Sequence, residues 1–214
     1  MRRIACVLVG LIGILDPLPA RADEASDAFQ AGRRLLGEQK PREAAEAFQQ
    51  AARLDSSYPE VFIYLGDALL QLKKYEEALA CYGKSLATDP PSGGEVFRAV
   101  EGVGCVCLGL ATEPKREDLT EPMKKKLIDD AIRCFDRVIE ISPKYAPVYN
   151  NRGRACHLKK DLDRAITDFN KAIELDPACA DAYENRGKAW DDKGDQKRAE
   201  ADVAKARELR AKKK

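Results

Sequence analysis

Apolar residues recur along this chain at spacings of three and four positions, and short polar turns separate the apolar runs. This spacing places apolar side chains on one face of a helix, so the pattern predicts amphipathic α-helices. One such stripe, across two helices, consists of Leu65, Leu69, Leu79, Tyr82 and Leu86.

Polar turns and prolines divide the predicted helices into pairs. Lys73-Lys74 and Lys160-Asp161 predict the turn inside a pair. An Asp-Pro or Ser-Pro dipeptide ends the second helix at 89–90, 142–143 and 176–177, because the residue before proline is pushed out of the helical region. The chain is therefore predicted to be all-α and built from successive helical hairpins.

A period of 34 residues relates these hairpins. It separates Gly32 from Gly66 and Gly153 from Gly187, and an alanine follows twelve residues after each of these glycines. Small residues are expected where two helices cross closely, since large side chains would hold the helices apart. A fixed period in this range indicates stacked supersecondary units that bury a shared core.

The residues at fixed places in each unit resemble the tetratricopeptide repeat family, whose 34-residue pattern is W-x2-L-G-x2-Y…A-x3-F…P. One unit carries Phe62, Leu65, Gly66, Leu69, Ala78, Tyr82, Ser85 and Pro90; another carries Tyr149, Gly153, Cys156, Ala165, Phe169, Ala172 and Pro177. The resemblance implies an α-solenoid of about five helix-turn-helix repeats in one domain, 23–214. The predicted repeats are 25–58, 59–92, 97–145, 146–179 and 180–213.

The third repeat departs from this pattern. Its glycine-to-alanine interval, from Gly104 to Ala131, is 27 residues instead of 12, which indicates an insertion at about 111–126. Thr120 followed by Pro122 predicts that a helix restarts there, with a cap and then a proline in the first turn. Since insertions in solenoids tend to lie on one face, we expect this segment to contribute specificity.

The N-terminus is typical of a secretory signal. Arg2 and Arg3 precede an uncharged run at 4–15, and Ala20-Arg21-Ala22 fits a cleavage site. A run of twelve apolar residues is too short for a membrane-spanning helix, which needs about 20. We therefore expect residues 1–22 to be removed, leaving no membrane span, and the protein to be exported to the periplasm or outside a bacterial cell. An uncleaved anchor is the alternative.

The charge balance argues against a nucleic-acid partner. Removal of residues 1–22 takes away three arginines and one aspartate, so the formal net charge changes from +1 to −1. A chain this close to neutral has no global attraction for a polyanion. The lysine runs at 124–126 and 212–214 are local.

Six cysteines follow the predicted leader, and an even number in an exported protein leaves disulfides possible. Cys107 and Cys156 occupy packing positions, where a free thiol behaves as a small hydrophobe. Cys105 or Cys107 with Cys134 is the least unfavourable pairing.

No catalytic or metal-binding motif stands out. Cys156 and His157 are adjacent in sequence, so on a helix they point about 100° apart and are poorly placed to share a proton. Four closely spaced zinc ligands, a phosphate-binding glycine loop and a nucleophile elbow are all absent from the sequence. We therefore predict no enzymatic activity, no cofactor and no metal.

The family resemblance implies that the first helix of each repeat lines a concave face that binds partners. Positions counted from the repeat glycine give an apolar N-terminal half and a polar C-terminal half. The candidate partner-binding residues are Phe29, Arg33, Leu36, Ile63, Asp67, Leu70, Asn150, Asn151, Arg154, Glu184, Asn185 and Lys188. An alternative is that the apolar half is hidden by tight folding or self-association.

Asn151 and Asn185 lie at a place that family members use to bind a peptide backbone, a task that suits an amide because it both donates and accepts. Gln30, Tyr64 and Gly102 occupy that place in the other repeats, so only two such asparagines are present. The carboxylate clamp of chaperone-binding members is not matched.

These observations favour a non-catalytic scaffold or assembly factor that binds a protein or peptide segment in its groove. Two alternatives stay open: a self-assembling structural protein that forms homo-oligomers, and a regulatory subunit of a separate enzyme.

Overall fold

The computed structural model describes residues 18–56, 59–87, 93–114 and 116–212, and these residues form ten helices with no strand. The prediction of an all-α solenoid is confirmed. In chain order the helices are α1 (Leu18–Gly37), α2 (Pro41–Leu54), α3 (Pro59–Gln71), α4 (Tyr75–Leu86), α5 (Gly93–Thr112), α6 (Glu121–Ile141), α7 (Ala146–Leu158), α8 (Leu162–Leu175), α9 (Ala180–Asp192) and α10 (Gln196–Ala211).

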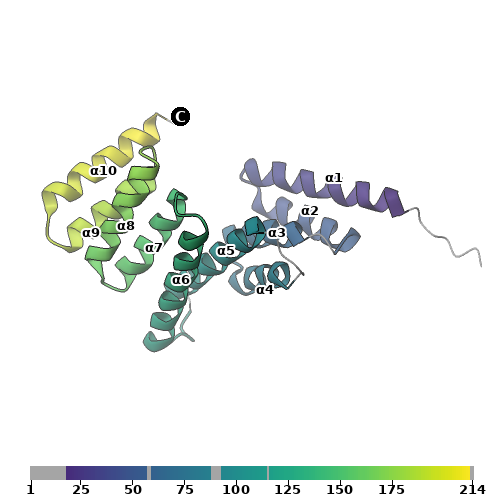
Figure 1. Ribbon diagram of the computed structural model, residues 1–214, viewed down its shortest axis with the longest axis horizontal. Coiled ribbons are helices and arrows are strands. Elements are labelled where there is room, and N and C mark those ends of the chain that lie inside the picture. Colours follow the sequence, from purple (N-terminus) through teal and green to yellow (C-terminus); the bar gives the residue numbers. More distant parts are fainter. Residues whose placement is uncertain (1–17, 57–58, 88–92, 115, 213–214) are drawn as a thin grey trace, which may run out of the picture.

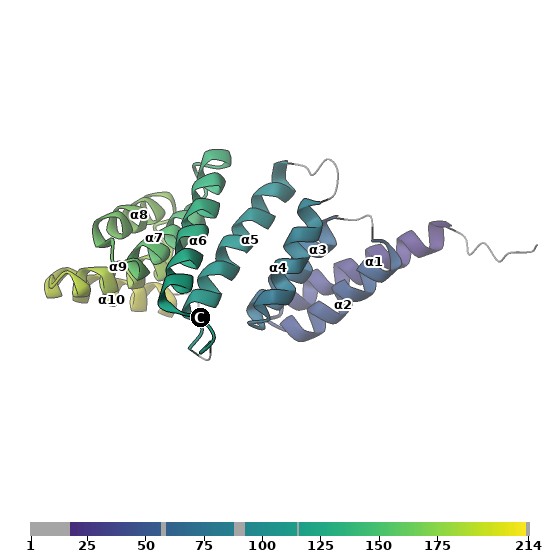
Figure 2. The same ribbon diagram turned by 90° about the horizontal axis from the view of Figure 1, so that it is seen from below.

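The helices stack as five antiparallel hairpins in an arc that runs from α1 to α10 (Figure 1). Each odd-numbered helix approaches the next odd-numbered helix, whereas no Cα atoms of successive even-numbered helices lie within 8 Å of each other. The array therefore curves with the odd-numbered helices on its inner side. Figure 2 shows α5 and α6 in the middle of the stack.

Glycine and an aromatic ring form the helix crossing inside most hairpins. A Cβ atom on Gly32 would lie 2.6 Å from the ring of Phe48, and one on Gly66 would lie 2.7 Å from Tyr82. The Tyr82 ring also contacts Gly102 of the next hairpin, so it is held between two glycines. Since Phe48 and Tyr82 are fully buried, these glycines set how closely the helices approach.

Two hydrophobic clusters make up the core, and α5 contributes to both. Val106 and Leu110 belong to the N-terminal cluster, while Cys107 and Leu108 belong to the C-terminal one. Val103 packs against both clusters. The five hairpins thus share a continuous apolar interior, as expected for stacked repeats.

The insertion in the third hairpin lengthens its second helix. α5 has 20 residues and α6 has 21, against 12 to 16 in α2, α4, α8 and α10. The segment 111–126 thus comprises the last two residues of α5, a connection and the first six residues of α6. Thr120 is the N-cap of α6 and Pro122 lies in its first turn, as predicted, although the Thr120 side chain forms no capping hydrogen bond.

The predicted leader lies largely beyond the described residues. Residues 1–17 are outside them, and α1 begins at Leu18, before the expected cleavage point. The signal at 1–22 therefore stays a prediction. Within the described part of the chain, no helix is long and apolar enough to cross a membrane.

Candidate functional site: a polar pocket on the inner face

A polar pocket of about 230 Å³ lies where α7 and α9 face the interior of the arc, beside the end of α10. Four of the candidate residues line it: Asn150, Arg154, Glu184 and Asn185. Asp181 and Arg210 complete the lining, and the sequence analysis did not select them. The repeat phase places the first four on the same face, because Asn150 and Glu184 lie three residues before the repeat glycine, Asn185 lies two before it and Arg154 lies one after it.

The asparagine amides link successive inner helices. Asn185 Nδ2 donates to Asn150 Oδ1 at 3.0 Å, and Asn151 Nδ2 lies 3.6 Å from the Cys105 sulfur, which is a weak contact. Among the described residues, the amide N–H groups of Asn150 and the carbonyl of Asn185 form no other hydrogen bond. One donor group and one acceptor are therefore free at the pocket for a partner's backbone.

Most of the charged side chains around the pocket form ion pairs with one another, but Arg154 does not. Arg210 contacts Asp181 at 2.7 Å and Glu184 at 2.5 Å, and Lys188 contacts Glu184 at 2.6 Å. The hydrogen bonds from Lys188 and Arg210 lower the pKa of Glu184, which therefore stays ionised. Arg154, by contrast, is exposed and forms no ion pair within the described part of the chain. It is the positive charge left available for a ligand.

In the N-terminal half of the predicted groove, the apolar residues expected to contact a partner are buried or partly buried. Phe29 and Ile63 have exposed fractions of only 3% and 1%, so their assignment as partner-binding residues is wrong. The ring of Phe29 packs edge-on against Tyr64 at 5.2 Å, and Ile63 belongs to the core cluster. Leu36 and Leu70 are partly buried against the same cluster. This half therefore does not present the contiguous apolar surface that the sequence suggested.

Arg33 and Asp67 are also engaged in internal contacts. The Arg33 guanidinium lies 5.5 Å from the centre of the Tyr64 ring. Asp67 accepts hydrogen bonds from Tyr82 and Arg98, both at 2.7 Å. Burial raises the pKa of Asp67, and these two partners oppose that effect.

Glu101 forms a second acidic centre on α5 that the sequence analysis did not select. It is partly buried and receives a hydrogen bond from the Tyr145 hydroxyl, beside Asp67 and Arg98. Burial raises its pKa from 4.5 to about 7, although Tyr145 and Arg98 oppose the shift. Its signal in sequence was weak, because a single glutamate on a helix is usually solvated.

Replacing Glu101 with glutamine is expected to stabilise the protein at about pH 8 by ~2 kcal/mol, and to have little effect at about pH 4. The folded protein binds the Glu101 proton more tightly than the unfolded chain, so stability falls as pH rises from about 4.5 to about 7. Glutamine removes that loss and still accepts from Tyr145. Urea unfolding at both pH values measures the difference, and an equal effect at the two would contradict it.

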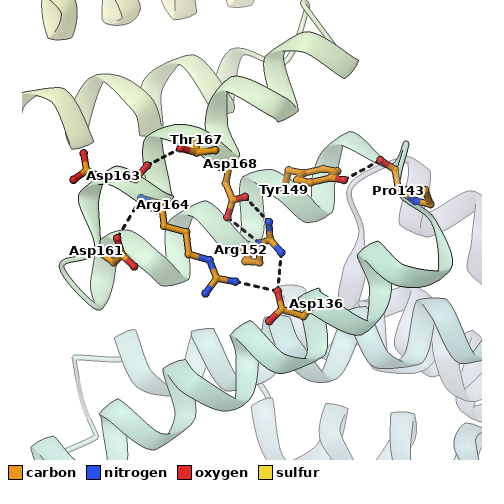
Figure 3. A network of polar contacts seen from close by, with 9 residues as sticks. All are labelled: Asp136, Pro143, Tyr149, Arg152, Asp161, Asp163, Arg164, Thr167 and Asp168. Carbon is orange, nitrogen blue, oxygen red and sulfur yellow. Dashed lines mark hydrogen bonds and ion pairs between the residues drawn. The ribbon is translucent and has the colours of Figure 1, made fainter.

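A buried ion-pair motif recurs in the last two hairpins, and Figure 3 shows its first instance, around Arg152. Arg152 donates to both oxygens of Asp168, at 2.9 and 2.6 Å, and to Asp136 at 2.7 Å. Arg186 makes the equivalent contacts to Asp202 and to Asn170. The side chain of Asp168 is only 3% exposed, so the pair replaces apolar packing at this crossing.

The cysteine and histidine residues show no catalytic arrangement. The six described cysteines are free thiols, and burial raises the pKa of Cys156 to about 11. His157 Nε2 lies 3.0 Å from Asp192. Across the part of the chain that the structure describes, no group of three or more His, Cys, Asp or Glu side chains could hold a metal ion.

Stacked hairpins with a polar inner pocket define an α-solenoid repeat protein. Residues 29–93 and 146–179 match sequence models of the tetratricopeptide repeat, so these parts of the chain consist of tetratricopeptide repeats. Proteins of this fold generally present surfaces for protein interaction rather than catalytic sites. No curated protein matches the chain.

Solved structures share the fold along most of their length. MamA (41-end) from Desulfovibrio magneticus RS-1 is 25% identical with a TM-score of 0.63, covering 89% of this chain and 97% of that chain. TTC0263, a thermophilic repeat protein of Thermus thermophilus, is 19% identical with a TM-score of 0.72, covering 88% and 96%. YrrB, described as having an unusual peptide-binding site, is 20% identical with a TM-score of 0.55, covering 91% and 92%.

Proposed function

We propose that this chain is a non-catalytic scaffold or assembly factor that holds an extended segment of a partner protein against the inner face of its C-terminal hairpins. The observation that carries the proposal is the pocket where Asn150, Asn185 and Arg154 meet. A periplasmic or extracellular location, which follows from the predicted export signal, is part of this proposal.

The chemistry of the pocket suits a peptide. Asn150 and Asn185 offer amide groups that can pair with a backbone N–H and C=O. Arg154 can donate to a carboxylate, on a side chain or at a chain end. The free Arg154 and the engaged acids beside it favour a partner that carries negative charge at this point.

Head-to-tail self-assembly through the C-terminal end is less favoured by the residues there. In α8, Ile166, Phe169 and Ile173 lie at places where α10 has Glu200, Val203 and Arg207. The outer face of α10 is thus more polar than that of α8 and is suited to contact with solvent, as is common in terminal repeats. Within the described residues, α9 and α10 carry no large hydrophobic side chain that is exposed.

The test is an affinity capture from the native organism, with wild-type chain and the triple variant Asn150→Ala, Asn185→Ala and Arg154→Ala. We expect the variant to recover a specific partner at least about tenfold less, because each side chain contributes roughly 0.5–1.5 kcal/mol or more to binding. Mass spectrometry identifies and quantifies the captured proteins.

Arg137→Ala is the matched control, because Arg137 is an exposed arginine on the even-numbered helix α6. All variants should melt at nearly the wild-type temperature, since these residues lie at the surface. Equal capture by wild type and triple variant would exclude the pocket as the binding site. Capture of the chain alone, with a size that rises with concentration, would favour self-assembly instead.

A further inference from the structure

A second groove, separate from the inner pocket, lies beside the extended start of α6. It has a volume of about 630 Å³ and is lined by Glu121, Pro122, Lys125, Ile128, Leu158 and Lys159. Its wall is formed by the first two turns of α6 and by the last residues of α7. It shares no lining residue with the inner pocket. The groove exists because the insertion lengthens α6.

The connection between α5 and α6 does not fill this groove. Arg116 bridges Asp118, at 2.8 Å, and Glu76 on α4. Glu113 forms a hydrogen bond with Tyr75, which is also on α4. The connection is thereby held on the α4 side of α6, and the side toward α7 is left open.

The floor of the groove is apolar. Pro122 and Ile128 come from α6, and Leu158 comes from α7 with 41% of its surface exposed. Met123, on the same turn of α6 as Pro122, is 48% exposed. Two of the four large hydrophobic side chains that are exposed within the described residues therefore lie at this end of the α6–α7 pair. Grouped exposed apolar side chains of this kind mark interaction surfaces.

The rim of the groove carries positive charge that is not neutralised. Glu121 is paired with Lys124 at 2.9 Å, and Lys159 is paired with Asp129 at 2.7 Å. Lys125 lines the groove and forms no ion pair with any described residue. A ligand that placed a carboxylate beside Lys125 would supply the missing partner, and an apolar side chain of the same ligand would cover Leu158 and Ile128.

We propose that this groove docks a short acidic segment of a partner protein, in which one or two large apolar side chains stand next to Asp or Glu. The apolar side chains occupy the floor formed by Pro122, Ile128 and Leu158, and the carboxylate pairs with Lys125. The insertion thereby gives the array a second contact with a partner, outside its inner face.

The experiment is a selection of random 16-residue peptides displayed on phage, with the full chain as the target. Enriched peptides are then synthesised with a fluorescent label and titrated with each variant by fluorescence anisotropy. The test variants are Leu158→Ser and Lys125→Glu. The matched controls are Leu79→Ser, which changes a leucine of 40% exposure on α4, and Lys126→Glu, which changes an exposed lysine that does not line the groove.

We expect one class of enriched peptides to combine Leu, Ile, Met or Phe with adjacent Asp or Glu. This class should bind at least about tenfold more weakly to each test variant and equally to both controls, with weaker binding at high salt. It should be insensitive to Asn150→Ala with Asn185→Ala, which reports on the inner pocket alone. Circular dichroism melting checks that each variant is folded.

Two results would overturn the inference. One is a selection in which no peptide loses affinity for Leu158→Ser and Lys125→Glu. The other is a set of groove-dependent peptides that are basic or uncharged, which would contradict the acidic partner. Peptides sensitive only to the asparagine changes would support the inner pocket and exclude this groove.

Discussion

Replacing Asp168 with alanine is expected to destabilise the protein by ~3 kcal/mol, because a largely buried arginine then loses one of its two carboxylates. The Arg152 side chain is 17% exposed and would keep only Asp136. Removing one partner of a buried ion pair lowers the free energy of unfolding by more than the intact pair contributes to it. The reason is that the remaining buried charge is poorly solvated by water. The midpoint of urea unfolding, followed by circular dichroism, measures the loss.

The matched control comes from the chain itself. In the second hairpin the equivalent places hold Leu65 and Cys81, which are both buried and apolar. The double variant Arg152→Leu with Asp168→Cys copies that pair and is expected to lie within ~1 kcal/mol of wild type, since apolar side chains can replace a buried ion pair. If the double variant were as unstable as Asp168→Ala, the loss would not come from the unpaired charge.

The substitution Gly66→Leu is expected to cost roughly 3 kcal/mol or more, because it overpacks a helix crossing. Even a single Cβ atom at Gly66 would lie 2.7 Å from the Tyr82 ring. The ring cannot retreat, because Gly102 of the next hairpin lies against its other side and its hydroxyl donates to Asp67. Thermal and urea unfolding would both show the loss.

Gly83→Leu provides the comparison for this prediction. Gly83 is an exposed residue of α4, and a Cβ atom there would meet nothing within 4 Å. Leucine should stabilise α4 slightly, by about 0.5 kcal/mol, because glycine is a poor helix former. Similar losses at both glycines would show that helix propensity or solubility, rather than the crossing, governs the result.

The fold was predictable because the signals that specify it are local and repeated. A glycine, an alanine twelve residues later and an apolar stripe are properties of each hairpin, and they recur with the period of the stack. The start of α6 after Thr120 was also predictable, from the N-cap residue and from Pro122. The length of α5 was less predictable, because the helix begins with Gly93 and Gly94, and glycine is a poor helix former.

The site was predictable only in part, because position on a helix fixes the direction of a side chain but not what covers it. Phe29 has the right phase for the inner face, yet Tyr64 of the next hairpin and Phe48 of its own pack against it. Asn150, Arg154 and Asn185 instead line a pocket whose other residues, Asp181, Glu184 and Arg210, are all charged.

The ion pairs in the last two hairpins carried a sequence signal that could have been used. Arginine stands directly before the repeat glycine at 152 and 186, and aspartate follows sixteen residues later in both cases. In the second hairpin both places are apolar. From one hairpin to another, the two positions are thus either both charged or both apolar. This correlation is expected if the two side chains contact each other.

The contact pattern of the helices has a mechanical consequence. Successive odd-numbered helices are in contact along the whole arc, whereas successive even-numbered helices are not. A small rotation between neighbouring hairpins about the inner contacts would therefore produce a larger displacement at the outer, even-numbered helices. Bending of this kind would change the distance between α6 and α8, which Arg152 of α7 bridges through Asp136 and Asp168. One hydrogen bond among the described residues spans that gap, from Arg164 to Asp136 at 3.1 Å, and it is exposed to solvent (Figure 3). Dissolved ions weaken such an exposed contact, so we expect ionic strength to act on the outer contact of Arg164 with Asp136 more than on the buried pair of Arg152 with Asp168.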